Sequence, residues 1–288
     1  MSSKLSPPII FNRKLLKTRL RKADFTTAPD FIVKRAADDL LDRLLTIKRP
    51  FSRSLDISFF NNQFSDAIIY SGRTKPLKAG LISGDVIVDD EFLPFKEESF
   101  DLVVCGMNLQ WVNDLPGTLK QIRRILAPDG LFIACLPGGL TFNEMRNVFI
   151  HAELEKTGGS SPRVHPFIDV RDMGALLQRA GFTLPVADVD SFTIRYDNLY
   201  SMINEIRQMI FSNVLHSVSN KNLTRDIIMH AQKLYSDNFS DDDGRLRLSF
   251  EIIWLSGWAA HDSQQEPAKP GSATHSLEKA INITKIIE

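Results

Sequence analysis

The feature that most constrains the fold of this chain is an alternation of short apolar runs with helical patterns in its first half. Five such runs are rich in valine and isoleucine, are bounded by Gly, Pro, Asp or Asn, and are too short for typical helices, so they predict buried strands. They cover residues 54–60, 66–72, 85–90, 100–106 and 130–138. Between the last two runs, residues 115–126 have helical apolar spacing, and this strand–helix–strand order indicates a parallel sheet.

The second half of the chain is richer in helical patterns. Residues 141–156 and 170–180 predict helices, and residues 186–196 predict a strand. Residues 199–238 predict two further helices, inserted before a last strand over residues 245–259. In an open α/β fold this insertion is where a lid would lie. We therefore expect a seven-stranded, mainly parallel sheet with helices on both faces.

The N-terminal segment is strongly basic. Residues 1–22 contain seven Lys or Arg and no Asp or Glu, and their apolar residues recur at helical spacing. A basic amphipathic helix packed on the domain is favoured over a transit peptide or a nucleic-acid-binding arm. We divide the chain into basic N-terminal helices (1–50), an α/β domain (51–260) and a polar C-terminal tail with a final short helix (261–288).

The overall composition limits the partners. The 35 basic and 35 acidic residues give a formal net charge of zero, which argues against a general nucleic-acid-binding protein. No run approaches the roughly 18 apolar residues that a membrane span needs, so we expect no membrane span and a soluble chain. Cys105 and Cys135 lie in apolar runs without metal-ligand spacing, which favours buried side chains in a reducing compartment over a metal site.

The most specific local unit consists of two adjoining segments. They read LPFKEESFDLVVCGMNLQWVND over residues 93–114 and LKQIRRILAPDGLFIACLPGG over residues 119–139. This unit resembles the fourth strand, the following helix and the fifth strand of class I S-adenosylmethionine (SAM) methyltransferases. The resemblance implies a Rossmann-like α/β fold that binds SAM at the carboxyl ends of its strands.

The similarity continues through GGLTFNEMR, SPRVHPF, LLQRAGF and GWAAHDSQQEP, and so covers nearly the whole chain. This extended pattern resembles the homologues of the mitochondrial arginine-hydroxylase assembly factor of respiratory complex I, a group related to the malonyl-carrier-protein O-methyltransferases of biotin synthesis. It implies a protein or carrier-protein substrate, with a respiratory-complex subunit as one such partner. Only ten residues precede the family's N-terminal element at Phe11, which is too few for a typical transit peptide and predicts a bacterial cytoplasmic protein.

The glycine-rich loop that normally approaches SAM is altered in this chain. In the family the first strand ends in a loop whose glycines let the backbone approach the cofactor without a Cβ in the way. Ser58, Phe60 and Asn62 stand at those glycine positions, and Phe60 adds the most bulk. The expected second strand ends over residues 69–72 without the carboxylate that would bind both ribose hydroxyls.

Other residues match the cofactor contacts that the resemblance implies. Asp56 matches the end of the first strand and either binds the cofactor or caps loop amides. Asp89 or Asp90 matches the acid near the adenine; the spacing to Leu93 favours Asp89, with a turn role as the alternative. Ser58, Gly106 and Met107 complete the predicted cofactor-binding set.

Four residues are candidates for a substrate pocket. Asn108 and Trp111 follow the fourth strand, although Trp111 is equally consistent with a packed aromatic. Arg163 and His165 lie in a Gly/Ser/Pro loop of the kind that often carries function. The sequence assigns no catalytic residue and contains no metal-binding motif.

Two classes of function remain open from the sequence. One is an enzyme that carries out SAM-dependent methyl transfer, or the arginine hydroxylation that the resemblance implies, on a protein or carrier-protein substrate. The other is a non-catalytic assembly factor for a respiratory complex I subunit that does not bind SAM. The lost glycines favour the second class, and the well-formed remainder of the fold favours the first.

Overall fold

The computed structural model describes residues 8–60, 62–216, 223–265, 271–272 and 276. Its sheet has seven strands in the order β3-β2-β1-β4-β5-β7-β6. The strands are β1 (Ser54–Ser58), β2 (Leu77–Gly80), β3 (Val86–Ile87), β4 (Phe100–Gly106), β5 (Leu126–Pro137), β6 (Phe182–Tyr196) and β7 (Leu246–Ala259). β1 to β5 are parallel and β7 is antiparallel to both of its neighbours, which confirms the predicted mainly parallel sheet.

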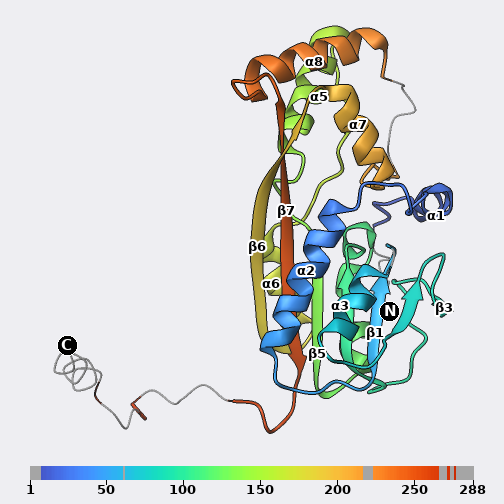
Figure 1. Cartoon of the computed structure of the whole chain (residues 1–288), viewed down its shortest axis with the longest axis vertical. Helices are drawn as coiled ribbons and strands as arrows, with labels where there is room; N and C mark the ends of the chain where they lie inside the picture. The colour runs from blue at the N-terminus through green and yellow to red at the C-terminus, as the bar shows by residue number, and fades with distance from the viewer. Residues whose placement is uncertain (1–7, 61, 217–222, 266–270, 273–275, 277–288) are drawn as a thin grey trace, which may run out of the picture.

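Helices lie on both sides of this sheet. They are α1 (Arg13–Lys22), α2 (Phe31–Thr46), α3 (Gln63–Tyr70), α4 (Leu115–Ile125), α5 (Asn143–Thr157), α6 (Val170–Arg179), α7 (Leu199–Gln208) and α8 (Arg225–Phe239), with a single 3-10 turn at Leu109–Trp111. The long strands β6 and β7 extend past the parallel strands towards α5, α7 and α8 (Figure 1). No described helix is long and apolar enough to cross a membrane.

The alternation of side chains along the central strands produces two cores. In β4, Leu102 and Val104 point to the face covered by α2 and α3, whereas Val103 and Cys105 point to the face covered by α4 and α6. Both cysteines are free and buried. α4 begins where the Asp114 carboxylate accepts the backbone N–H of Gly117, an N-cap that fixes the connection between β4 and the helix.

The prediction of a strand over residues 66–72 is wrong, because Gln63–Tyr70 forms α3. Phe64, Ala67 and Ile68 are buried on one side of this helix, a spacing that a short apolar run does not distinguish from a strand. The true second strand is β2, whose sequence LKAG contains no β-branched residue and gave no strand signal. Residues 77–84 (LKAGLISG) contain no carboxylate, and Asp85, which follows them, accepts the backbone N–H of Lys78 of β2 at 2.9 Å.

The basic N-terminal segment forms α1, with Leu16 and Leu20 buried against the domain. The expected helix of the C-terminal tail lies outside the described residues. The division of the chain into three regions stays a prediction.

A core substitution tests the packing of α4 on the sheet. Leu119 is fully buried, so we expect Leu119→Ala to lower the free energy of unfolding by about 2–5 kcal/mol through lost burial and a residual cavity. Leu140→Ala is the matched control at a mostly exposed position and should change this free energy by less than about 0.5 kcal/mol. Urea unfolding followed by circular dichroism gives both values, and equal losses would contradict the assigned packing.

Candidate functional site

The candidate site lies where the carboxyl ends of the parallel strands meet. β1 and β4 are neighbours, with Ser58 opposite Gly106, although β2 and β3 separate them in the sequence. The direction of the strand order reverses at this point, and open α/β sheets bind ligands in the crevice that such a reversal creates. The loops after β1 and β4 and the end of β3 lie together at this point, since Phe59 stacks on Trp111 and Asp90 contacts Asn108.

Asp56 is buried beneath the loop that follows β1. Its Oδ2 accepts a hydrogen bond from Ser65 Oγ of α3 at 2.5 Å. Burial raises the pKa of Asp56, while the hydroxyls of Ser65 and Ser58 and the positive charge of Lys78 oppose that rise. Asp56 therefore connects β1 to α3. Ser58 lies beside it, so these two predicted cofactor residues are close together.

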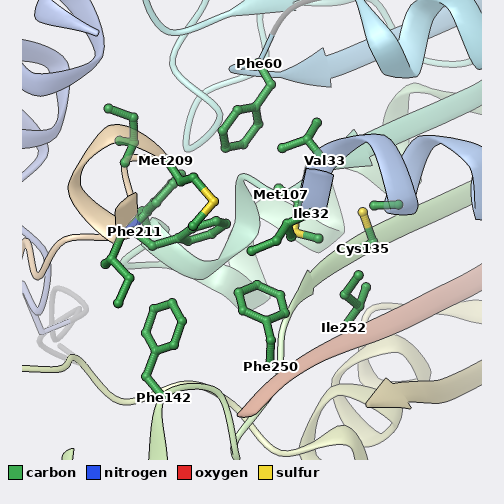
Figure 2. Packing of buried hydrophobic residues seen from close by; sticks show 14 of the residues in the cluster. Ile32, Val33, Phe60, Met107, Cys135, Phe142, Met209, Phe211, Phe250 and Ile252 are labelled. Atoms are coloured by element: carbon green, nitrogen blue, oxygen red, sulfur yellow. The ribbon is translucent and has the colours of Figure 1, made fainter. Parts of the chain in front are cut away.

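Aromatic rings fill the cleft above the ends of β1 and β4. Phe59 stacks on Trp111, with ring centroids 5.9 Å apart and planes 15° apart. Phe211 lies 6.3 Å from Trp111 and 6.4 Å from Phe60, and Phe142 lies 6.2 Å from Phe211, all between ring centroids. All five side chains are buried, and Figure 2 shows Phe60, Phe142 and Phe211 converging from three different segments. We call these five residues the aromatic cluster.

The start of α1 closes the cleft from the side of β3. Arg13 donates to Asp89 Oδ1 at 2.8 Å and to the carbonyl oxygen of Trp111 at 3.1 Å, and it also forms an ion pair with Asp90. Lys17, one turn later, pairs with Asp89 at 3.3 Å. The basic face of the N-terminal helix is thus used to neutralise two adjacent carboxylates of its own chain.

The two adjacent carboxylates differ in environment. Asp90 is 1% exposed, and burial raises its pKa to about 6 although the charge of Arg13 acts in the opposite direction. For the half-exposed Asp89, burial also favours a rise, but the charge of Arg13 and the hydrogen bonds from Glu91, Lys17 and Arg13 outweigh it and lower the pKa. Asp90, rather than the favoured Asp89, contacts Asn108 in the cleft, at 3.4 Å from its Nδ2.

A second chain segment holds α1 in place. Asn12 donates its backbone N–H to the carbonyl oxygen of Val214, and His216 donates its own to that of Ile10, both at 2.7 Å. Arg19 of α1 donates to the carbonyl oxygen of Asn213 at 2.7 Å. The segment that contains Phe211 of the aromatic cluster is thus bonded to the start of α1.

Gly106 and Met107 support the packing of the cleft. A Cβ at Gly106 would lie 2.4 Å from the Phe64 ring, so a glycine is required for α3 to pack against β4. Met107 is buried with a positive φ of 54°, and Phe142 and Ile210 share this left-handed conformation. Backbone of this kind is strained in residues other than glycine and persists where the surroundings determine it.

The structure separates the four predicted substrate-pocket residues. Asn108 and Trp111 lie together in the cleft, where Trp111 belongs to the aromatic cluster. Arg163 pairs with the buried Glu153 of α5, with 2.8 Å between Arg163 Nε and Glu153 Oε1. His165 is buried beside Phe11, and burial lowers its pKa to about 4.

The sequence did not reveal three residues that shape the site. Phe59 was not singled out because only Phe60 stands at a glycine position of the family, although two consecutive phenylalanines after a buried strand indicate an apolar contact there. Arg13 belonged to a basic segment whose charge pattern gave no partner. Phe211 came from the expected lid region, so only its general position was foreseeable.

The chain resembles known proteins at the level of a domain model and of whole chains. Residues 59–134 match the family model of the methyltransferase domain. The chain is 33% identical over 295 residues to the mitochondrial arginine-hydroxylase NDUFAF5 of Mus musculus, covering 96% of this chain and 85% of that protein. It is 29% identical over 186 residues to the malonyl-[acyl-carrier protein] O-methyltransferase of Halorhodospira halophila, covering 65% of this chain and 61% of that protein.

A solved structure agrees on the architecture. A Bacillus halodurans protein assigned to the methyltransferases superposes with a TM-score of 0.52 at 16% identity, covering 77% of this chain and 99% of that chain. At this identity the likeness supports the fold alone.

The strand order and the position of the cleft define a class I SAM-dependent methyltransferase fold, as the sequence predicted. The chain belongs to the SAM-dependent methyltransferase family, and within it to the group of the arginine-hydroxylase NDUFAF5 proteins. SAM is the cofactor of the wider family.

A cavity of about 340 Å³ lies beside the aromatic cluster, and its lining includes Phe59, Phe60, Lys78 and Asp85. Phe59 and Trp111 stack on each other after β1 and β4, and Phe211 lies against both Phe60 and Trp111. Arg13 already neutralises Asp90 at the end of β3. Among the described residues, no group of three His, Cys, Asp or Glu side chains could hold a metal ion.

The buried Asp90 generates a pH-dependent stability. Because its folded pKa of about 6 is above the ordinary aspartate value of 3.8, the folded state keeps this proton over a range where the unfolded state releases it. Relative to Asp90→Asn, wild type should therefore lose roughly 1–3 kcal/mol of unfolding free energy as the pH rises from about 4 to 7.

Denaturant unfolding at several pH values measures this difference. Asp172→Asn, which removes the same charge at an exposed position, is the matched control for net charge. A difference between wild type and Asp90→Asn that stays constant with pH would contradict the buried, proton-binding state of Asp90.

Proposed function

We propose that this chain is a partner-binding assembly factor of the methyltransferase family whose cofactor cleft is closed by its own side chains in the free protein. The observation that carries the proposal is the aromatic cluster, which occupies the ends of β1 and β4. A closed cleft removes the usual route to methyl transfer but leaves the outer surfaces available for binding a partner.

The relatives support a protein or carrier-protein partner. Over nearly its full length, the chain matches proteins named arginine-hydroxylase, and over a shorter part it matches a malonyl-[acyl-carrier protein] O-methyltransferase. The second name specifies a group carried by a protein, and the first names arginine, a side chain that a protein substrate would present. We place a respiratory-complex subunit first among such partners. A bacterial cytoplasmic location stays a prediction from the sequence, since the full-length relatives are mitochondrial proteins.

SAM-dependent methyl transfer on such a partner is the second candidate function. The neighbouring ends of β1 and β4, and the match of residues 59–134 to the methyltransferase-domain model, support a cofactor site there with Asp56 and Gly106 among its contacts. This function requires the aromatic cluster to separate before SAM enters. Arginine hydroxylation, the activity in the relatives' name, is a further proposal within the enzyme class.

A titration with SAM distinguishes the two candidates. We expect the triple variant Ser58→Gly, Phe60→Gly and Asn62→Gly to bind SAM at least tenfold more tightly than wild type, because it restores the glycines and removes one ring of the cluster. The apparent affinity of a site falls with the fraction of molecules in which that site is open. Isothermal titration calorimetry of the full chain measures both affinities.

Phe92→Gly is the matched control, since it removes an exposed phenylalanine outside the aromatic cluster. Its SAM affinity should equal that of wild type. Low-micromolar binding by wild type would contradict the closed cleft and support methyl transfer. If neither wild type nor a folded triple variant binds SAM, methyl transfer is rejected and the assembly-factor function stands.

A further inference from the structure

A cavity of about 230 Å³ lies on the outer side of the aromatic cluster. Its walls are largely apolar and are formed by two helices and two rings of the cluster. α5 contributes Met145 and Phe149, α7 contributes Ile203 and Ile206, and Phe142 and Phe211 complete the wall. A cavity with this lining favours an aliphatic group.

Three arginines line this cavity, and one of them, Arg163, is paired with Glu153. Arg19 of α1 and Arg207 of α7 line it and also line a second, more open cavity of about 590 Å³ beside it. The pKa of Arg19 is lowered, first by burial and then by the positive charge of Arg207. The fold therefore holds two like charges close together, an arrangement that a bound anion would stabilise.

The neighbouring charges do not neutralise this pair. In the part of the chain that the structure describes, none of the ion pairs includes Arg19 or Arg207, and Arg19 donates to the carbonyl oxygens of Ser212 and Asn213. Asp24 lines the larger cavity, but its carboxylate accepts hydrogen bonds from Thr26 and Thr27. Lys22 adds a further positive charge there.

We propose that this site binds an amphipathic anion, namely an aliphatic carboxylate of medium chain length. Its chain fills the apolar cavity between α5 and α7, and its carboxylate contacts the guanidinium groups of Arg19 and Arg207. Arginine suits this role because its planar group can donate two parallel hydrogen bonds to one carboxylate.

The site shares a wall with the closed cofactor cleft. Phe211 lines the cavity, and its ring centroid lies 6.3 Å from that of Trp111 and 6.4 Å from that of Phe60. An aliphatic chain in the cavity therefore touches a ring that closes the cleft. The binding site shares Phe142 and Phe211 with the aromatic cluster, but it does not rest on the proposed function, because the cavity and its arginines are present whether or not SAM binds.

Calorimetric titration of the full chain with butanoate, hexanoate and octanoate tests the proposal. Octanoate should bind with one-to-one stoichiometry, and each methylene added along this series should tighten binding roughly threefold to fourfold. Octanol should bind at least tenfold more weakly than octanoate, and octylamine should not bind. Equal affinities for the three eight-carbon probes, no dependence on chain length, or no binding of octanoate at millimolar concentration would each overturn the site.

A pair of variants locates the binding. Arg207→Gln removes one charge from an exposed position and should weaken octanoate about tenfold while leaving the affinity for octanol unchanged. Arg179→Gln, at the exposed end of α6, is the matched control and should bind octanoate like wild type. An unchanged octanoate affinity in a folded Arg207→Gln variant would place the ligand elsewhere and overturn the assignment. SAM affinity, measured separately, reports on the proposed function without affecting this outcome.

Discussion

The ion pair between Arg13 and Asp90 is the interaction on which the arrangement of the site depends. Asp90 is almost fully buried, and a buried carboxylate is costly unless a charged, hydrogen-bonding partner accompanies it. Because Arg13 is the first residue of α1, satisfying Asp90 also places that helix over the ends of β3 and β4. The backbone pairing of residues 10–12 with residues 214–216 then brings Phe211 onto the aromatic cluster.

The ends of β1 and β4 and the cavity beside Arg19 and Arg207 differ in charge and in lining. The family fold offers a polar cleft between β1 and β4, but here the cleft holds stacked rings and its nearby acids are neutralised from within the chain. Arg19 and Arg207 have no acidic partner among the described residues, and they border an apolar cavity on the outer side of the aromatic cluster. The binding site that we propose therefore belongs to α1, α5 and α7.

The sequence predicted most of the framework because buried strands and amphipathic helices have different apolar spacing. β1, β4, β5 and β7 and the helices α2, α4, α5 and α6 were recognisable in this way. Residues 66–72 were misassigned because eight residues of a helix show barely two turns of its period. β2 was missed because a four-residue strand without β-branched side chains gives no such signal.

By itself, the sequence determined the class of fold, the family and the loss of the glycine loop, since each depends on residue types at fixed spacing along the chain. It also located Asp56, Gly106 and Trp111 near the strand ends. Only the tertiary structure decided what replaced the cofactor contacts. Arg13, Asp90 and Phe211 are far apart in the sequence, and their pairing follows from burial and charge neutralisation, which act between segments that only the folded chain brings together.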